Sequence, residues 1–138
     1  MADFSLDFDT AQVLPFMQER IPGLAPGGDV RCIGLRRCGT LVAGVAYEGF
    51  NGHNMWVHLA GGEGGHWLNR QFLRAGFAYP FTVCGVSRLS GYVNASNLAA
   101  RRFDEHVGFT LETSLRGAAP DGGDVLIYVM RKEDCRYV

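Results

Sequence analysis

The sequence predicts an α+β fold: a mixed, mostly antiparallel sheet with a βαβ crossover and helices on both faces. Three observations lead to this class. Apolar and polar residues alternate in several short segments, which is the period of β-strands. Apolar residues recur at helical spacing in longer segments. One of these helices stands between two strands, as a parallel crossover requires. The strands before it follow one another through short turns, so we expect them to pair antiparallel.

The first part of the chain supplies a helix and three strands. Residues 10–20 are a helix candidate capped by Asp9, and Pro15 inside it implies a kink or a late start. A loop rich in Pro and Gly follows at 21–29. The expected strands cover 30–37, 40–50 and 54–60, and the first two are joined by a tight turn.

The middle of the chain supplies the crossover. In the strand 54–60, alternation places His58 and Met55 on opposite faces. The Gly-rich stretch 61–65 then leads into a helix at 66–79, which Pro80 is expected to terminate. The buried stripe of this helix is predicted to be Leu68, Phe72, Ala75 and Tyr79.

The last part of the chain completes the sheet. A strand at 87–93 is followed by a helix at 96–107, for which Gly108 is a natural C-cap. Its core face is predicted to contain Ala99, Ala100, Phe103 and Val107. Two further strands are expected at 111–119 and 124–132.

Length and charge exclude several function classes. With 138 residues the chain fits one domain, 1–138, and its net charge of −1 gives no electrostatic reason to expect nucleic acid or a membrane as partner. There is no run of ~20 apolar residues for a membrane span. The acidic N-terminus lacks the basic and apolar regions of a signal peptide. We therefore expect a cytoplasmic protein.

Cysteine spacing argues against a metal site. Cys32, Cys38, Cys84 and Cys135 form no CxxC pair, and no histidine pair stands at ligand spacing. Cys32 and Cys38 can face each other across a hairpin, but reduced thiols are favoured for a cytosolic protein. No metal is expected.

The segment VNASNLAARRFDEHVGF, residues 93–109, is the most specific signal in the chain. Its residues Val93, Asn97, Ala100, Gly108 and Phe109 follow the pattern V-x-x-x-N-x-x-A-(x)7-G-F. The segment resembles the acyl-CoA-binding half of a GCN5-related N-acetyltransferase (GNAT). A structural alternative stays open, in which Asn94 or Ser96 merely caps the helix and Asn97 assists the cap.

The C-terminal part, 111–135, resembles the ending of acetyltransferases related to ribosomal-protein and aminoglycoside N-acetylating enzymes. Thr113 departs from that pattern, since glycine is usual there. The segment 67–81 is also similar to this subgroup. The matching residues in the C-terminal part are Glu112, Leu115, Arg116, Ala118, Asp124, Ile127, Tyr128, Met130 and Arg131.

The resemblance implies the acyl-CoA N-acyltransferase fold, acetyl-CoA as acyl donor, and an amine acceptor on a small molecule or a protein. It places the pantetheine along the backbone of the strand 54–60, where one N–H near Leu59 or Ala60 would stabilise the oxyanion. The Gly-rich loop and the helix that it opens would hold the pyrophosphate, although a flexible connector is the alternative. The residues implied in donor binding are Leu59, Ala60, Gly64, Gly65, His66, Trp67, Asn97, Arg101 and Phe103. Basic residues for the 3′-phosphate of CoA are sought among Arg70, Arg74, Arg101 and Arg102.

The resemblance also implies catalytic side chains. Glu48 or His58 is the candidate general base, and the unperturbed pKa of a histidine near neutrality suits that role. The general acid is less clear, because Asp104 stands where many relatives have a tyrosine, and an ordinary aspartate is ionised at neutral pH. Three alternatives follow: no side-chain acid is needed, Tyr92 or Tyr128 supplies the proton, or activity has been lost. We favour the first.

Two main functions remain in competition. One is an N-acetyltransferase acting on an unidentified primary amine. The other is a catalytically inactive domain with the same fold that binds CoA or another protein, which Asp104 and the irregular glycine loop favour. A weaker third hypothesis is a homodimerisation unit that uses strand edges near the C-terminus.

Overall fold

The computed structural model describes residues 3–61 and 69–138. Within them, the helices are α1 (Thr10–Arg20), α2 (Arg70–Ala78) and α3 (Leu98–Val107), with a π-helical turn at Tyr79–Val83 and a 3₁₀ turn at Lys132–Asp134. The strands are β1 (Phe4–Asp7), β2 (Arg31–Arg37), β3 (Thr40–Glu48), β4 (Asn54–Gly61), β5 (Arg88–Asn94), β6 (Thr110–Leu115) and β7 (Val125–Arg131).

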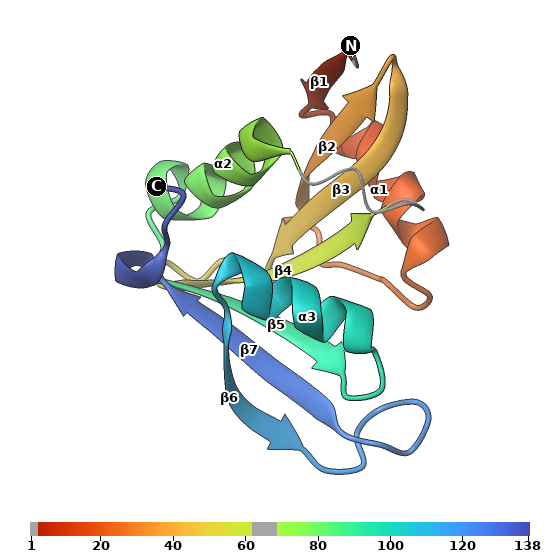
Figure 1. The fold of residues 1–138 in the computed structure, drawn as a ribbon, viewed down its shortest axis with the longest axis vertical. Helices are drawn as coiled ribbons and strands as arrows, with labels where there is room; N and C mark the ends of the chain where they lie inside the picture. The colour runs from red at the N-terminus through yellow and green to blue at the C-terminus, as the bar shows by residue number, and fades with distance from the viewer. Residues whose placement is uncertain (1–2, 62–68) are drawn as a thin grey trace.

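The strands form one mixed sheet in the order β1-β2-β3-β4-β5-β7-β6. Neighbouring strands are antiparallel except β4 and β5, which are parallel and connected through α2. Helix α1 lies on one face of the sheet, and α2 and α3 lie on the other (Figure 1). The predicted α+β class, with its crossover and its helices on both faces, is confirmed. In the described residues, no helix is long and apolar enough to span a bilayer.

Two glycines allow α1 to pack directly on β2 and β3. A Cβ atom at Gly34 would lie 2.8 Å from Val13, and one at Gly44 would lie 3.0 Å from both Val13 and Met17. Because real Cβ atoms are essentially never that close to other atoms, a larger residue at Gly34 would push the helix off the sheet. Val13 and Met17 are fully buried there, in a small core.

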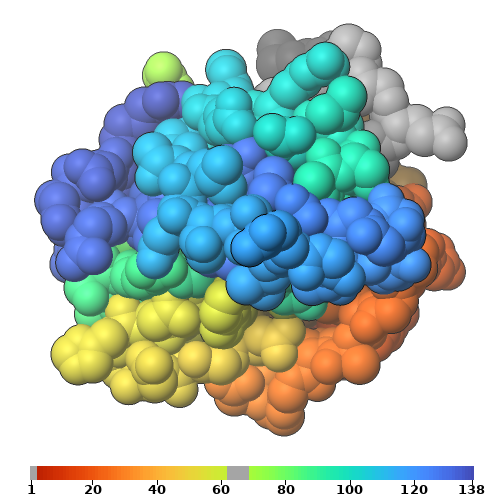
Figure 2. Space-filling model, turned by 90° about the horizontal axis from the view of Figure 1, so that it is seen from below, coloured from red at the N-terminus to blue at the C-terminus, as the bar shows by residue number. Residues whose placement is uncertain are grey.

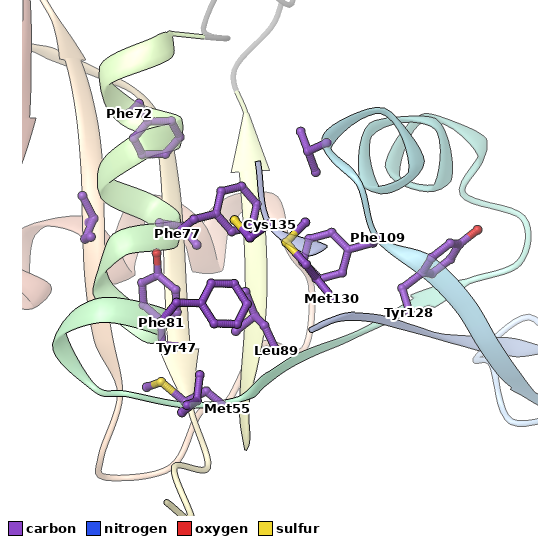
Figure 3. Close-up of a cluster of buried hydrophobic side chains, with 14 of the residues drawn as sticks. Tyr47, Met55, Phe72, Phe77, Phe81, Leu89, Phe109, Tyr128, Met130 and Cys135 are labelled. Carbon is purple, nitrogen blue, oxygen red and sulfur yellow. The ribbon is translucent and has the colours of Figure 1, made fainter. Parts of the chain in front are cut away.

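The main core lies on the opposite face, under α2 and α3. Phe77 and Phe109 pack near Cys135 between these two helices, and Tyr128 points its hydroxyl toward α3 (Figure 3). The labelled side chains of this core are Tyr47, Met55, Phe72, Phe77, Phe81, Leu89, Phe109, Tyr128, Met130 and Cys135. This core fixes how the two crossover helices sit above β4, β5 and β7.

Two expectations about the start and middle of the chain are wrong. Strand β1 was not expected, because FSLD is too short for its alternation to stand out, and only pairing with β2 makes it a strand. Helix α2 begins at Arg70, later than expected, since Asn69 is its N-cap and accepts a hydrogen bond from Phe72 N. Residues 66–68 of the expected helix, with Leu68 of its predicted stripe, lie outside the described residues. The α-helix does end just before Pro80, at Ala78, and the chain continues into the π-helical turn, where the missing N–H of Pro80 is tolerated near the start.

Later boundaries also differ in part. Helix α1 begins at Thr10, so Pro15 does not cause a late start. Ala99 is exposed and is not part of the core face of α3. Strand β6 ends at Leu115, since the chain turns through Gly117, whose φ is 69°. Gly108, with φ 114°, is the C-cap expected for α3.

Candidate functional site

Strands β4 and β5 separate partway along their length. Their pairing ends at Trp56 and Ser90, so the rest of β4, up to Gly61, has no partner on this side among the described strands. In Figure 1 the two strands start side by side and then point apart. A Cβ atom at Gly91 would lie 3.6 Å from Val57 O, so the gap opens beyond that contact. We call the space between 57–61 and 91–94 the β4–β5 opening.

The three candidate catalytic residues meet at this opening. His58 Nε2 lies 2.6 Å from Glu48 Oε2. The His58 and Tyr92 rings meet edge to face, with centroids 5.4 Å apart, across the opening. The three side chains come from three consecutive strands of the sheet, β3, β4 and β5. Alternation along β4 places His58 on the side of the sheet that α1 covers.

The loop that follows α1 holds Glu48 in position. Gly27 N donates to Glu48 Oε1 at 3.0 Å, while Oε2 of the same carboxylate faces His58. Asp29 accepts from the backbone N–H groups of Phe50 and Gly49, and these hydrogen bonds lower the pKa of its carboxyl. Figure 2 views this end of the molecule, where the segments around residues 25 (orange) and 50 (yellow) lie on one side and the β6–β7 segment (blue) on the other.

The protonation pattern of this pair follows from its geometry. An ionised carboxylate only accepts hydrogen bonds, so His58 Nε2 carries the hydrogen of this contact when Glu48 is ionised. In the neutral tautomer that fits this contact, the lone pair of the ring is on Nδ1. The pair is well buried, with 7% of the His58 side chain and 23% of the Glu48 side chain exposed. Tyr92, whose ring contacts that of His58, is 54% exposed.

The predicted donor-binding residues divide into two groups. Leu59 and Ala60 lie on β4 beyond the point where β5 departs, which leaves backbone groups on that edge for a ligand. Gly64, Gly65, His66 and Trp67 lie outside the described residues.

Helix α3 presents the remaining predicted donor ligands. Asn97 is its N-cap and accepts from Ala100 N at 3.2 Å, so this residue does cap the helix. Arg101 Nη1 donates to Ala95 O, but its Nε is buried and has no hydrogen-bond partner among the described residues. A buried donor without a partner is costly, so a ligand acceptor near the start of α3 would be stabilising. Phe103 packs against the main core.

Two variants distinguish the two possible roles of Asn97, helix capping and binding of the acyl donor. Asn97→Ala is expected to lower the free energy of unfolding by about 1 kcal/mol, because Ala100 N loses its acceptor. Asn97→Ser keeps a capping oxygen but loses the amide N–H groups, so its stability is expected to be near that of the wild type. If Asn97 binds CoA, both variants bind CoA more weakly in calorimetric titrations. Wild-type affinity in Asn97→Ser would leave the residue as a cap alone.

Asp104 departs from the sequence expectation of an ionised carboxylate. Burial, with a smaller contribution from the charge of Glu105, raises the pKa of Asp104 to about 7. A substantial fraction of this carboxyl is therefore protonated at neutral pH and can donate. Tyr128 is one of the two tyrosines expected as possible proton donors to the thiolate. It is buried and donates a hydrogen bond to Glu105 Oε2 at 2.7 Å, so it does not reach into the β4–β5 opening.

The structure resembles solved N-acetyltransferases over nearly all of its length. A mutant of the spermidine N-acetyltransferase SpeG from Vibrio cholerae matches with a TM-score of 0.79 at 14% identity, covering 97% of this chain and 95% of that one. A GNAT-family acetyltransferase from Streptococcus pneumoniae matches with a TM-score of 0.75 at 13% identity, covering 94% and 99%. No protein-family model and no curated protein matches the sequence. At these identities the likeness shows the fold alone: the chain has the fold of the GNAT acetyltransferases.

Proposed function

We propose that this protein is an acyl-CoA-dependent N-acyltransferase that moves an acetyl group from acetyl-CoA to a primary amine. The observation that carries the proposal is the placement of the Glu48–His58 pair at the rim of the β4–β5 opening. Strand separation exposes backbone donors beside a buried, hydrogen-bonded base. Both are needed when an amine attacks a thioester.

The two reactants would approach from opposite faces of the sheet. The residues proposed for the donor lie on β4 and α3, and α3 covers the face opposite α1. The Glu48–His58 pair and Tyr92 lie on the α1 side. The β4–β5 opening connects the two faces of the sheet. An amine held near His58 on one face would there reach a thioester carbonyl bound along β4. Holding both groups in place contributes about 7–11 kcal/mol to lowering the barrier in well-oriented systems.

Each residue then has one role in the transfer. His58 accepts the amine proton on Nδ1, and Glu48 orients the ring and stabilises the imidazolium that forms. A backbone N–H near Leu59 or Ala60 donates to the carbonyl oxygen as it becomes an oxyanion. Asp104 replaces the expected tyrosine as the group that protonates the leaving thiolate. Arg101 Nε would supply a hydrogen bond to the donor near the start of α3.

The decisive experiment measures donor binding first and turnover second. Millimolar acetyl-CoA is expected to raise the melting temperature, because a ligand that binds only the folded state must stabilise it. Thiol release would then be followed over a panel of amines that includes polyamines, aminoglycosides and peptides. Absence of a shift would refute the proposal. A shift without turnover on any amine would favour the inactive CoA-binding domain.

A further inference from the structure

A cavity of about 380 Å³ lies between α2 and the end of the chain, away from the Glu48–His58 pair. Its lining residues are Arg70, Arg74, Arg136, Tyr137 and Val138. Arg70 and Arg74 stand four residues apart on α2 and therefore share one side of that helix. Three guanidinium groups around one cavity are a local concentration of positive charge in a chain whose net charge is −1.

The third arginine, Arg136, is held by packing of the chain end. The Tyr137 ring stacks on Phe77, with centroids 5.0 Å apart and planes within 7°. Arg136 Nη2 donates to His106 O at the end of α3. A guanidinium has five N–H groups, so this bond leaves others for a ligand. Arg136 could not be predicted from the sequence as a neighbour of α2, because its position there depends on this packing.

Within residues 3–61 and 69–138, the three arginines also have no acidic partner. Other arginines of the chain are paired: Arg36 with Asp7 at 2.8 Å and Arg88 with Glu112 at 2.7 Å. Among the described residues, no carboxylate lies within 4.0 Å of a nitrogen of Arg70, Arg74 or Arg136. An anion in the cavity would offset the mutual repulsion of these three charges.

We propose that this cavity is a binding site for a phosphate-bearing small molecule. Guanidinium groups match the oxygens of phosphate in a bidentate geometry, and several arginines together select for a doubly charged phosphate group. Two sources have this chemistry: the ribose phosphate of CoA, and a separate phosphorylated metabolite. The proposal rests on the proposed function only in the first case.

Titration with inorganic phosphate at low ionic strength tests the site itself. Phosphate is expected to raise the melting temperature of the wild type, and Arg74→Gln and Arg136→Gln are each expected to weaken its binding about tenfold, because each loses a charge-assisted contact. Glutamine is a good helix former at position 74, and position 136 is exposed and outside the helices, so both variants should fold. Arg116→Gln, at an exposed position outside the cavity, is the matched control and should bind as the wild type does.

Comparison of CoA with dephospho-CoA identifies the source. If the phosphate belongs to CoA, both variants lose affinity for CoA while their affinity for dephospho-CoA stays that of the wild type. If it belongs to another metabolite, both variants lose phosphate binding and keep wild-type affinity for both nucleotides. The proposal is overturned if phosphate does not bind, or if the variants bind phosphate and CoA as the wild type does. If phosphate binds through these arginines but CoA does not bind at all, the proposed function is refuted and the proposed phosphate site is supported.

Discussion

Replacement of Glu48 by glutamine is expected to lower kcat for acetyl transfer by about 10²- to 10⁴-fold, the usual contribution of a positioned acid–base group. The change is nearly isosteric. The amide oxygen of the glutamine can still accept from Gly27 N, and its NH₂ group can donate to His58 Nε2. That donation would force the imidazole proton onto Nδ1, so the ring would present the wrong tautomer to the amine.

Steady-state kinetics with matched variants test this result. Glu19→Gln removes an exposed carboxylate at the end of α1 and should leave kcat unchanged. Because Glu48 and His58 act as one unit, the double variant with His58→Ala should be no slower than His58→Ala alone. A Glu48→Gln enzyme within threefold of the wild type, with its circular dichroism unchanged, would contradict the assignment of this pair as the base.

Replacement of Asp104 by asparagine is expected to stabilise the fold and slow the reaction at once. In unfolded chains an aspartate has a pKa near 3.9, whereas burial raises the pKa of Asp104 to about 7. Below pH ~4 the carboxyl is protonated in both the folded and the unfolded state, so it does not destabilise the fold. As the pH rises from 4 to 7, only the unfolded state releases the proton, so the free energy of unfolding falls. Above pH ~7 this loss of stability is constant, at up to about 4 kcal/mol.

Asparagine has nearly the same shape and no charge to bury. At pH 8 the Asp104→Asn variant is therefore expected to melt about 10 °C higher than the wild type, and at pH 4 the two should melt together. Thermal melts across this range measure the difference. Asp134→Asn, at an exposed position, is the control and should show no such pH dependence. Equal melting temperatures at pH 8 would mean that Asp104 is not held with a raised pKa.

The kinetic part of the same prediction concerns the leaving thiolate. Wild-type activity should decline as the pH rises above about 7, because Asp104 then loses the proton that it donates. The asparagine variant should lack this decline and turn over about 100-fold more slowly at its optimum. If the variant gains stability but keeps the wild-type rate, the reaction needs no side-chain acid, which is the alternative favoured in the sequence analysis.

The sequence alone was informative about elements with strong local signals. The period of 2 in 54–60 predicted that His58 and Met55 face opposite sides of the sheet, and the two residues indeed belong to opposite faces. Gly108 was predicted as a C-cap because only a residue tolerant of positive φ ends a helix in that way. The helix between two strands predicted the parallel pair β4–β5. The resemblance to GNAT enzymes also pointed to Glu48, His58 and Tyr92 one by one.

Tertiary structure decided how these residues combine. The contact between Glu48 and His58, the strand separation beside Tyr92 and the burial of Asp104 depend on groups far apart in the chain. Arg136 reaches α2 only because Tyr137 stacks on Phe77, about 60 residues earlier. Residue types and periods fix which face a side chain takes, since those are local properties of the backbone. Distances, burial and hence protonation come from packing between elements, and packing is not encoded in any one segment.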